Sequence, residues 1–282
     1  MDKALVIGLG MGTQYVSWLK TLGYSVTTVD MDPAKGADFT DHKEAVQSSK
    51  FNIIYIGTPN YTHELIARDV AASTDFLLIE KPGVKDSVAW TQLVRDFPST
   101  RIAMVKNNQY RFETSGYKSL LKSSTNVKVV WSRQSGVPAS PWFVDKERSF
   151  GGVSRDLMPH LLSYYTNLTN YQTGIRLFAQ SADRTNTGID DHCEMEFTNN
   201  RVVWLLEACW RNNSKEEHYI EFTVQDKQIR FELGDYFTAF GGCPAGPYMN
   251  MIKTCMDNLN NQSFWDDQLE QDVWIHKQIE NL

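Results

Sequence analysis

Three polar residues, Lys81, Asp156 and His160, are of the kinds that move a proton to or from a hydroxyl group. Asp156 and His160 are four residues apart, so on a helix their side chains share one face. A carboxylate beside an imidazole orients the ring and supports the imidazolium, and an ammonium stabilises a developing alkoxide. The set predicts His160 as general acid and base, Asp156 orienting that ring or a substrate hydroxyl, and Lys81 holding the reacting oxygen.

Each of these residues also has a purely structural interpretation. An Asp/His pair with this spacing is most often a surface pair or part of a helix cap. Lys81 precedes Pro82, so it is equally well explained as an exposed charge at a turn. The catalytic interpretation therefore depends on the elements that position the three side chains.

A glycine-rich segment near the N-terminus is typical of a dinucleotide-binding turn. Gly8 and Gly10 follow the apolar run 3–7 and precede an expected helix over 12–22. Gly8 permits a tight turn, Gly10 lets a pyrophosphate approach the backbone, and the start of the helix offers amide donors. Thr13 occupies the place of the third glycine of the usual pattern, which a small residue tolerates. The residues expected to hold the cofactor here are Gly8, Gly10, Met11, Gly12 and Thr13.

Asp30 ends the next expected strand, about 20 residues after the glycine turn, as in dinucleotide-binding folds. A carboxylate at this point accepts hydrogen bonds from the ribose 2′-hydroxyl and repels a 2′-phosphate. Asp30 therefore favours NAD(H) over NADP(H), although Lys35 is near enough in the sequence to weaken that preference.

Strands and helices alternate through the first part of the chain, which predicts right-handed crossovers and a doubly wound parallel sheet. Lys81 follows one of these strands, at the carboxyl end where such sheets bind ligands. We assign residues 1–113 to this Rossmann-type α/β domain. The expected strands are 3–7, 25–29, 51–56, 76–79 and 101–105, and the expected helices are 12–22, 62–72 and 87–97.

The pattern changes after this point to that of an α+β domain with a mostly antiparallel open sheet, assigned to residues 114–282. We expect this domain to bind substrate and to form a dimer. The expected strands are 127–131, 175–179, 193–197, 202–208, 219–224 and 228–232. The expected helices are 115–121, 153–166, 247–259 and 266–279.

Four short motifs in order resemble the Gfo/Idh/MocA family of oxidoreductases. They are the TPN-x-x-H segment at 58–63, with glycine before it, the EKP segment at 80–82, the RF element at 111–112, and G-G-x-x-x-D-x-x-x-H at 151–160. The resemblance implies hydride transfer between a nicotinamide and the hydroxyl or carbonyl carbon of a sugar, polyol or sugar derivative. It adds Thr58, Pro59, Asn60, His63, Glu80 and Lys81 to the expected cofactor-binding residues.

Several residues are expected to line the substrate pocket, namely Lys81, Arg111, Trp142, Arg155, Asp156 and His160. Arg155 departs from the family pattern, which has small or apolar residues there, so it bears mainly on substrate identity. A buried tryptophan and a solvated arginine explain Trp142 and Arg155 equally well. His63 either touches the cofactor or caps its own segment.

Composition excludes several other classes of protein. The net charge is −6 and no run of Lys or Arg exceeds two residues, so nucleic-acid binding is not expected. The sequence has neither an apolar stretch long enough to span a bilayer nor a leader pattern. We therefore expect a cytoplasmic protein without a membrane partner. The four cysteines, which lack metal or disulfide spacing, are expected to be buried or idle thiols. They are Cys193, Cys209, Cys243 and Cys255.

Two other functions compete with a dehydrogenase of small-molecule substrates. One is reduction of an unsaturated ligand, as in the similar biliverdin reductases, which needs no alkoxide-stabilising set. The other is a non-catalytic nucleotide-sensing regulator, for which loss of Lys81 or His160 would be the expected sign.

Large apolar groups alternate on both sides of the strand 202–208, so neither face of its sheet is plainly polar. We therefore expect a homodimer or dimer of dimers formed by sheet pairing. The alternative is that the helices 247–259 and 266–279 cover the sheet within one chain.

Overall fold

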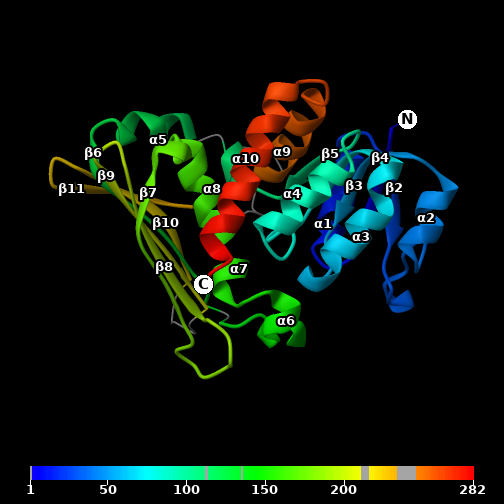
Figure 1. The fold of residues 1–282 in the computed structure, drawn as a ribbon, viewed down its shortest axis with the longest axis horizontal. Helices are drawn as coiled ribbons and strands as arrows, with labels where there is room; N and C mark the ends of the chain where they lie inside the picture. Colours follow the sequence, from blue (N-terminus) through cyan, green and yellow to red (C-terminus); the bar gives the residue numbers. More distant parts are fainter. Residues whose placement is uncertain (1, 112–113, 135, 211–215, 234–245) are drawn as a thin grey trace. The chain divides into compact units, whose positions relative to one another are not determined.

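A computed structural model describes residues 2–111, 114–134, 136–210, 216–233 and 246–282 (Figure 1). Backbone packing divides the chain into a first unit, Met1–Val105 with Ile252–Glu280, and a second unit, Lys106–Met251 with Asn281–Leu282. The predicted boundary at 113/114 therefore differs from the structural one. Residues 106–251 belong to the second unit, and residues 252–280, which include the C-terminal helix, belong to the first.

Within the described part of the first unit, five parallel strands form a sheet of order β2-β1-β3-β4-β5. The central strands are continuous apolar runs because helices cover both faces of a doubly wound sheet. This part of the predicted fold is confirmed. The strands are β1 (Lys3–Ile7), β2 (Ser25–Val29), β3 (Phe51–Ile56), β4 (Thr74–Ile79) and β5 (Arg101–Met104).

The helices of this unit match the predicted ones to within a few residues. One additional helix, α2 (His42–Ser48), was not predicted, because its seven residues are too few to show an amphipathic repeat. Asp41 caps this helix by accepting from the Lys43 amide. The others are α1 (Gly12–Thr21), α3 (His63–Val70), α4 (Ser87–Asp96) and α10 (Gln262–Ile279), with 3₁₀ turns η1 (Pro33–Lys35), η2 (Asn60–Thr62) and η3 (Ala71–Ser73).

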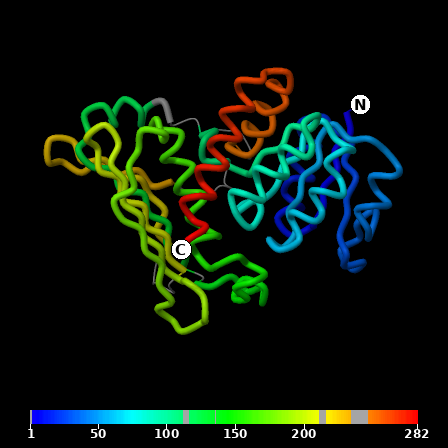
Figure 2. The backbone as a smooth tube through the Cα atoms, in the orientation of Figure 1, coloured from blue at the N-terminus to red at the C-terminus, as the bar shows by residue number. Residues whose placement is uncertain are grey.

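The C-terminal helix α10 packs beside α4 and against the edge strand β5, and the backbone tube follows the same course (Figures 1 and 2). Asp272 on α10 accepts from the Met104 amide at 3.2 Å, which satisfies a donor of the edge strand. Glu280 accepts from the Ser87 amide at the start of α4, at 2.8 Å. These bonds explain why α10 belongs to the first unit rather than to the predicted second domain.

In the described part of the second unit, six strands form a sheet of order β11-β10-β6-β9-β8-β7. Neighbouring strands are antiparallel except β6 and β9, so the predicted mostly antiparallel sheet is confirmed. The strands are β6 (Ser124–Ser132), β7 (Ile175–Ala182), β8 (His192–Asn199), β9 (Val202–Cys209), β10 (Glu217–Val224) and β11 (Lys227–Glu232).

The helical segments that accompany this sheet are short apart from α8 and α9. They are η4 (Asn107–Tyr110), α5 (Thr114–Leu121), η5 (Pro141–Val144), α6 (Lys146–Ser149), α7 (Val153–Asp156), α8 (Met158–Leu168) and η6 (Tyr171–Thr173). The chain then continues through α9 (Gly246–Asp257), which runs from the second unit into the first.

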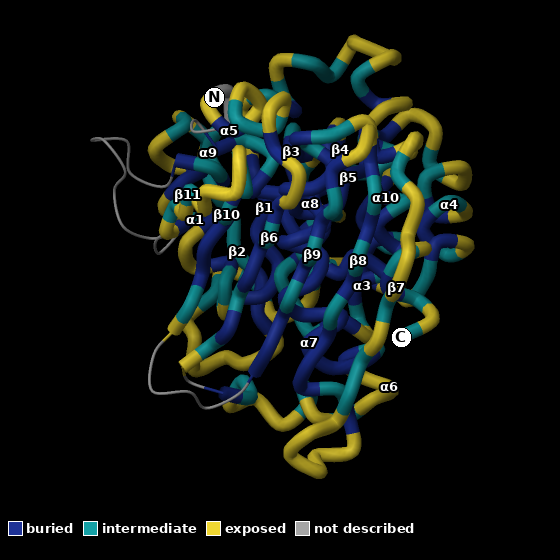
Figure 3. Tube along the Cα trace, turned by 90° about the vertical axis from the view of Figure 1, so that its left-hand side faces the viewer, coloured by how far each residue is buried: buried dark blue, intermediate teal, exposed yellow. Residues whose placement is uncertain are grey.

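Helix α8 covers one face of this sheet. Tyr165 stacks on Phe197 of β8 and meets Trp204 of β9 edge-on, and all three side chains are buried. The opposite face carries ion pairs, such as Lys128 with Glu207 at 3.1 Å, beside half-buried apolar groups. Figure 3 shows how much of the edge strand β7 is exposed. The outward face is therefore mixed, in agreement with the expectation that neither face is plainly polar.

The single helix predicted over 153–166 is two helices. α7 ends at Asp156, and α8 starts at Met158 with Pro159 in its first turn. Proline is tolerated in a first turn, but inside a helix it removes a hydrogen bond and clashes with the preceding turn. The prediction that Asp156 and His160 share one face of a continuous helix is therefore wrong.

No helix among the described residues has the length and apolarity to cross a bilayer. Cys193, Cys209 and Cys255 are buried thiols, as predicted, and burial raises the pKa of Cys193. Cys243 lies outside the described residues.

Candidate active site

The glycine turn after β1 is built by two close approaches. Gly8 has φ +91°, and a side chain there would meet the Gly57 carbonyl oxygen at 2.7 Å. A Cβ at Gly12 would lie 2.9 Å from Val6 Cγ1, so Gly12 allows α1 to pack tightly on β1. Thr13 is exposed and donates its hydroxyl to the Leu9 carbonyl at 3.0 Å. The close-packing position predicted for Thr13 is therefore occupied by Gly12.

This turn is suited to a dinucleotide. The sheet order reverses between β1 and β3, and ligands of such sheets bind at the carboxyl ends of these two strands. A Cβ at Gly10 would meet nothing within 4 Å, so the space over this residue is open. Met11 is the N-cap residue of α1, and the start of a helix favours an anion such as a pyrophosphate. The residues present fit the pyrophosphate of a dinucleotide.

Asp30 lies just after β2 and is tied to the glycine turn. Its Oδ2 accepts from the Leu9 amide at 2.7 Å and from Lys35 Nζ at 2.9 Å, while Oδ1 accepts from the Asp32 amide at 2.9 Å. Burial acts to raise the pKa of Asp30, but these hydrogen bonds outweigh it and the pKa is lowered. Asp30 is thus a carboxylate, with a lysine paired to it, at the place where dinucleotide folds bind the ribose.

The loop after β3 contains the predicted residues Thr58, Pro59 and Asn60, with His63 at the start of α3. His63 is wholly buried, and its ring nitrogens lie 2.8 Å from the carbonyl oxygens of Gly83 and Thr58. Burial lowers the pKa of His63. Of the two predicted alternatives, this geometry favours the structural one, because the ring joins the loop after β3 to the loop after β4.

The predicted Glu80 and Lys81 follow β4 directly. Glu80 Oε1 accepts from the Tyr55 hydroxyl and Oε2 from the Lys81 amide, both at 3.1 Å. Tyr55 in turn stacks on Tyr15 of α1 with ring centroids 3.6 Å apart. Glu80 therefore fixes the backbone of Lys81 at the carboxyl end of the sheet.

In the second unit, His160 on α8 is held by two adjacent asparagines of η4. Its Nδ1 lies 3.2 Å from Asn107 Oδ1, and Asn108 Nδ2 donates to the His160 carbonyl at 2.8 Å. Asn107 Nδ2 faces Asn108 Oδ1 at 3.4 Å, so the Asn107 oxygen points to the ring. An amide oxygen only accepts, which places the proton of a neutral ring on Nδ1 and leaves Nε2 as the base.

Asp156 has strong donors of its own. Its Oδ2 accepts from Trp210 Nε1 at 2.9 Å and pairs with Arg133 Nη1 at 3.3 Å. Asp156 is buried, and its charge-assisted and indole donors fix the carboxylate in place. Trp131 contacts the His160 ring at 5.2 Å between centroids and stacks on His218 at 4.3 Å.

The two glycines that open this motif make room for Asp190. A Cβ at Gly152 would overlap the Asp190 carbonyl oxygen, which accepts from the Val153 amide at 2.9 Å. The Asp190 carboxylate accepts from the amides of Gly152 and Ser154, both at 2.7 Å. Asp190 therefore caps α7, the short helix that ends in Asp156.

The three remaining predicted substrate residues differ in exposure. Arg111 is buried and donates to the Leu233 carbonyl at 3.0 Å. Arg155 is only 5% exposed, so its interpretation as a solvated arginine is wrong. Trp142 is half-buried and stacks on Phe143 at 3.9 Å between centroids. Phe112 of the RF element lies outside the described residues.

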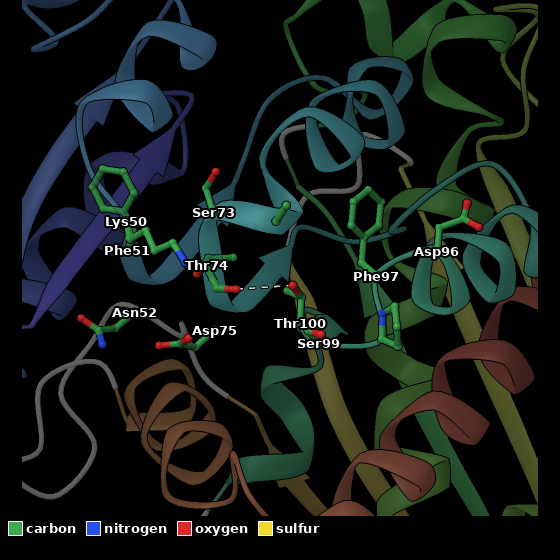
Figure 4. Close-up of a pocket in the computed structure, with 12 residues that line it drawn as sticks. Lys50, Phe51, Asn52, Ser73, Thr74, Asp75, Asp96, Phe97, Ser99 and Thr100 are labelled. Atoms are coloured by element: carbon green, nitrogen blue, oxygen red, sulfur yellow. Dashed lines mark hydrogen bonds between the residues drawn. The ribbon is translucent and has the colours of Figure 1, made fainter.

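A surface pocket of about 400 Å³ lies at the opposite end of the first unit's sheet (Figure 4). It surrounds the amino ends of β3 and β4, where Thr100 donates to the Thr74 carbonyl at 3.4 Å. Because nucleotides bind such sheets at the carboxyl ends of the strands, this pocket is not the cofactor site.

Four residues of the second-unit site were not predicted: Asn107, Arg133, Asp190 and Trp210. Each contacts its partner across more than twenty positions of sequence, so no local pattern marks it. Asn107 had one available signal, because a polar pair directly after an apolar strand occurs where parallel sheets place ligand-binding groups.

The fold is shared with solved structures of low sequence identity. GenD2 from gentamicin A biosynthesis, in complex with NAD, has 18% identity and a TM-score of 0.81, covering 99% of this chain and 92% of its own. An inositol dehydrogenase homologue from Azotobacter vinelandii with NAD+ has 13% identity and a TM-score of 0.78, covering 99% and 93%. Levoglucosan dehydrogenase with NADH and levoglucosan has 14% identity and a TM-score of 0.74, covering 98% and 94%.

These structures confirm the predicted two-part fold. No protein-family model matches the chain, and no curated protein matches its sequence.

Proposed function

We propose that the chain is an NAD(H)-dependent oxidoreductase that interconverts a hydroxyl and a carbonyl group on a sugar, polyol or sugar derivative. The observation that carries the proposal is the His160 ring, whose Nδ1 is held by Asn107 Oδ1. A ring fixed in this tautomer is prepared to take a proton at Nε2. The solved structures of similar fold, which hold NAD+ or NADH and include dehydrogenases named for inositol and levoglucosan, support the same class of reaction.

The residues divide the work of alcohol oxidation between them. His160 Nε2 takes the hydroxyl proton, and Asn107 and Asp156 keep the base and its surroundings in place. The Lys81 ammonium stabilises the negative charge on the reacting oxygen. A bound nicotinamide would accept the hydride that leaves the carbon in oxidation and would donate the hydride in reduction. In the reverse direction His160 returns the proton.

The cofactor would be held by the glycine turn and by Asp30. Gly8, Gly10 and Gly12 shape the pyrophosphate site, and Asp30 offers its carboxylate to the ribose. Lys35 partly neutralises Asp30, so the expected preference for NAD(H) over NADP(H) is moderate rather than absolute.

A substrate panel tests this function. The protein is mixed with NAD+ and a series of polyols and sugars, or with NADH and the corresponding carbonyl compounds, and absorbance of the reduced cofactor is followed. We expect turnover with at least one member and tighter binding of NADH than of NADPH. Binding of NADH without turnover of any polyol, sugar or unsaturated ligand would instead indicate a nucleotide-sensing regulator.

We also propose that the chain forms a homodimer, or a dimer of dimers, through the outward face of the second unit's sheet. Helix α10 packs on α4 and β5 within its own unit. The edge strand β7 exposes the apolar side chains of Ile175, Leu177 and Phe178. Their exposure to water is unfavourable for a monomer. Light scattering at micromolar concentration is expected to give a multiple of 32.3 kDa, and a mass near 32.3 kDa would contradict the dimer.

A further inference from the structure

Two glutamates lie directly opposite each other on the outward face of the second unit's sheet. Glu194 of β8 and Glu207 of β9 are register partners in an antiparallel pair. Like charges in this arrangement repel and destabilise the pairing unless a cation lies between them. The question is which cation these two carboxylates hold.

His192 completes the group on the same face. Its side chain is 2% exposed, and its Nε2 lies 3.4 Å from Glu194 Oε1 and 3.6 Å from Glu207 Oε1. Both distances are too long for strong hydrogen bonds. The other ring nitrogen, Nδ1, has no hydrogen-bond partner in the described part of the chain. A buried polar ring is thus directed at two carboxylate oxygens without a short bond to either.

We infer that His192, Glu194 and Glu207 form a structural binding site for a divalent transition-metal cation such as Zn²⁺. The three ligand atoms lie within 4.8 Å of one another. Zinc bonds of about 2.0–2.2 Å to nitrogen and oxygen place tetrahedral ligand atoms about 3.4 Å apart. The two distances from His192 Nε2 match this spacing, so a cation fits between the ligands with little movement.

The remaining carboxylate oxygens are already held. Gln180 Nε2 donates to Glu194 Oε2 at 2.8 Å, and Lys128 Nζ pairs with Glu207 Oε2 at 3.1 Å. Outer partners of this kind orient carboxylate ligands around a metal. With Lys128 counted, the group with neutral His192 has a net charge of −1, which a bound divalent cation would reverse to +1.

This site does not depend on the proposed oxidoreductase function. It lies on the outward face of the sheet, opposite the face covered by α8, and would tie β8 to β9. An enzyme without turnover could still bind the cation, and an active enzyme could lack it.

Calorimetric titration of the metal-stripped full-length protein with ZnCl₂ tests the inference. We expect one site per chain, and affinity lowered at least about tenfold in Glu194→Gln and in His192→Gln. Glu196→Gln, which changes the next outward carboxylate of the same strand, is the matched control and should bind like the wild type. His42→Gln controls for the histidine beside Asp69 in the first unit.

Two further readouts keep the test decisive if a variant folds poorly. Wild-type protein loaded with Co²⁺ should show the intense visible bands of a tetrahedral nitrogen and oxygen site, and zinc should raise the unfolding temperature of wild type but not of Glu194→Gln. Absence of stoichiometric zinc binding would overturn the inference, and so would binding that survives both ligand substitutions.

Discussion

Replacing Asn107 by leucine tests whether this side chain sets the tautomer of His160. Leucine keeps the branched outline of asparagine but removes the oxygen that lies 3.2 Å from His160 Nδ1. Leaving a buried polar group without its partner costs about 1–3 kcal/mol. If that cost falls on the catalytic form of the ring, kcat drops by roughly 5- to 150-fold, at about 1.4 kcal/mol for each factor of ten.

The assay is steady-state turnover on the substrate found in the panel, with NADH affinity measured alongside. Affinity should be unchanged, because the glycine turn and Asp30 lie in the first unit. Asn126→Leu, an exposed asparagine on β6, is the control and should leave kcat unaltered. Asn107→Asp keeps an acceptor and adds negative charge, so it should restore part of kcat and move the acidic limb of the pH–rate profile upward by roughly one unit. An Asn107→Leu enzyme with wild-type kcat and pH profile would refute the reasoning.

Three other predictions concern the cofactor and stability. Asp30→Ala should narrow the expected preference for NADH over NADPH in fluorescence titrations. An unchanged ratio of the two dissociation constants would show that Asp30 does not distinguish the ribose 2′-hydroxyl from a 2′-phosphate. Burial lowers the pKa of His218 to about 3, below its unfolded value of about 6.5. The unfolded state therefore binds the proton first, and stability should fall by up to about 1.4 kcal/mol per pH unit below about 6.5; urea midpoints at pH 7 and pH 5 should differ less in His218→Phe. Gly152→Ala should lower the free energy of unfolding by about 2 kcal/mol, since its methyl group overlaps the Asp190 carbonyl, whereas Gly116→Ala has open space and should not.

Most of the strand and helix pattern could be predicted because it depends on local residue types. Buried parallel strands are apolar runs that end in glycine or a charged residue, as at Ile7–Gly8 and Ile56–Gly57. The break between α7 and α8 was also visible, because Pro159 cannot occupy a helix interior. The prediction of one helix over 153–166 gave too little weight to this residue.

Other features depend on contacts between distant parts of the chain. An amphipathic helix such as α10 can cover any apolar surface, and long-range bonds such as the one from the Met104 amide to Asp272 reveal which surface it covers. Asn107 and Trp210 each approach their partners across more than fifty positions, from separate elements. Spacing therefore identified His160 and Asp156 as candidates but not the side chains that hold them.

The central claim is that Lys81 and His160 act on the substrate oxygen while the first unit binds NAD(H). The most direct measurement compares kcat and the NADH dissociation constant for wild type, Lys81→Ala and His160→Ala, with Lys122→Ala and His42→Ala as surface controls. We expect both active-site variants to lose roughly a hundredfold or more in kcat with little change in NADH affinity. Near wild-type turnover in either variant, with NADH still bound, would contradict the account.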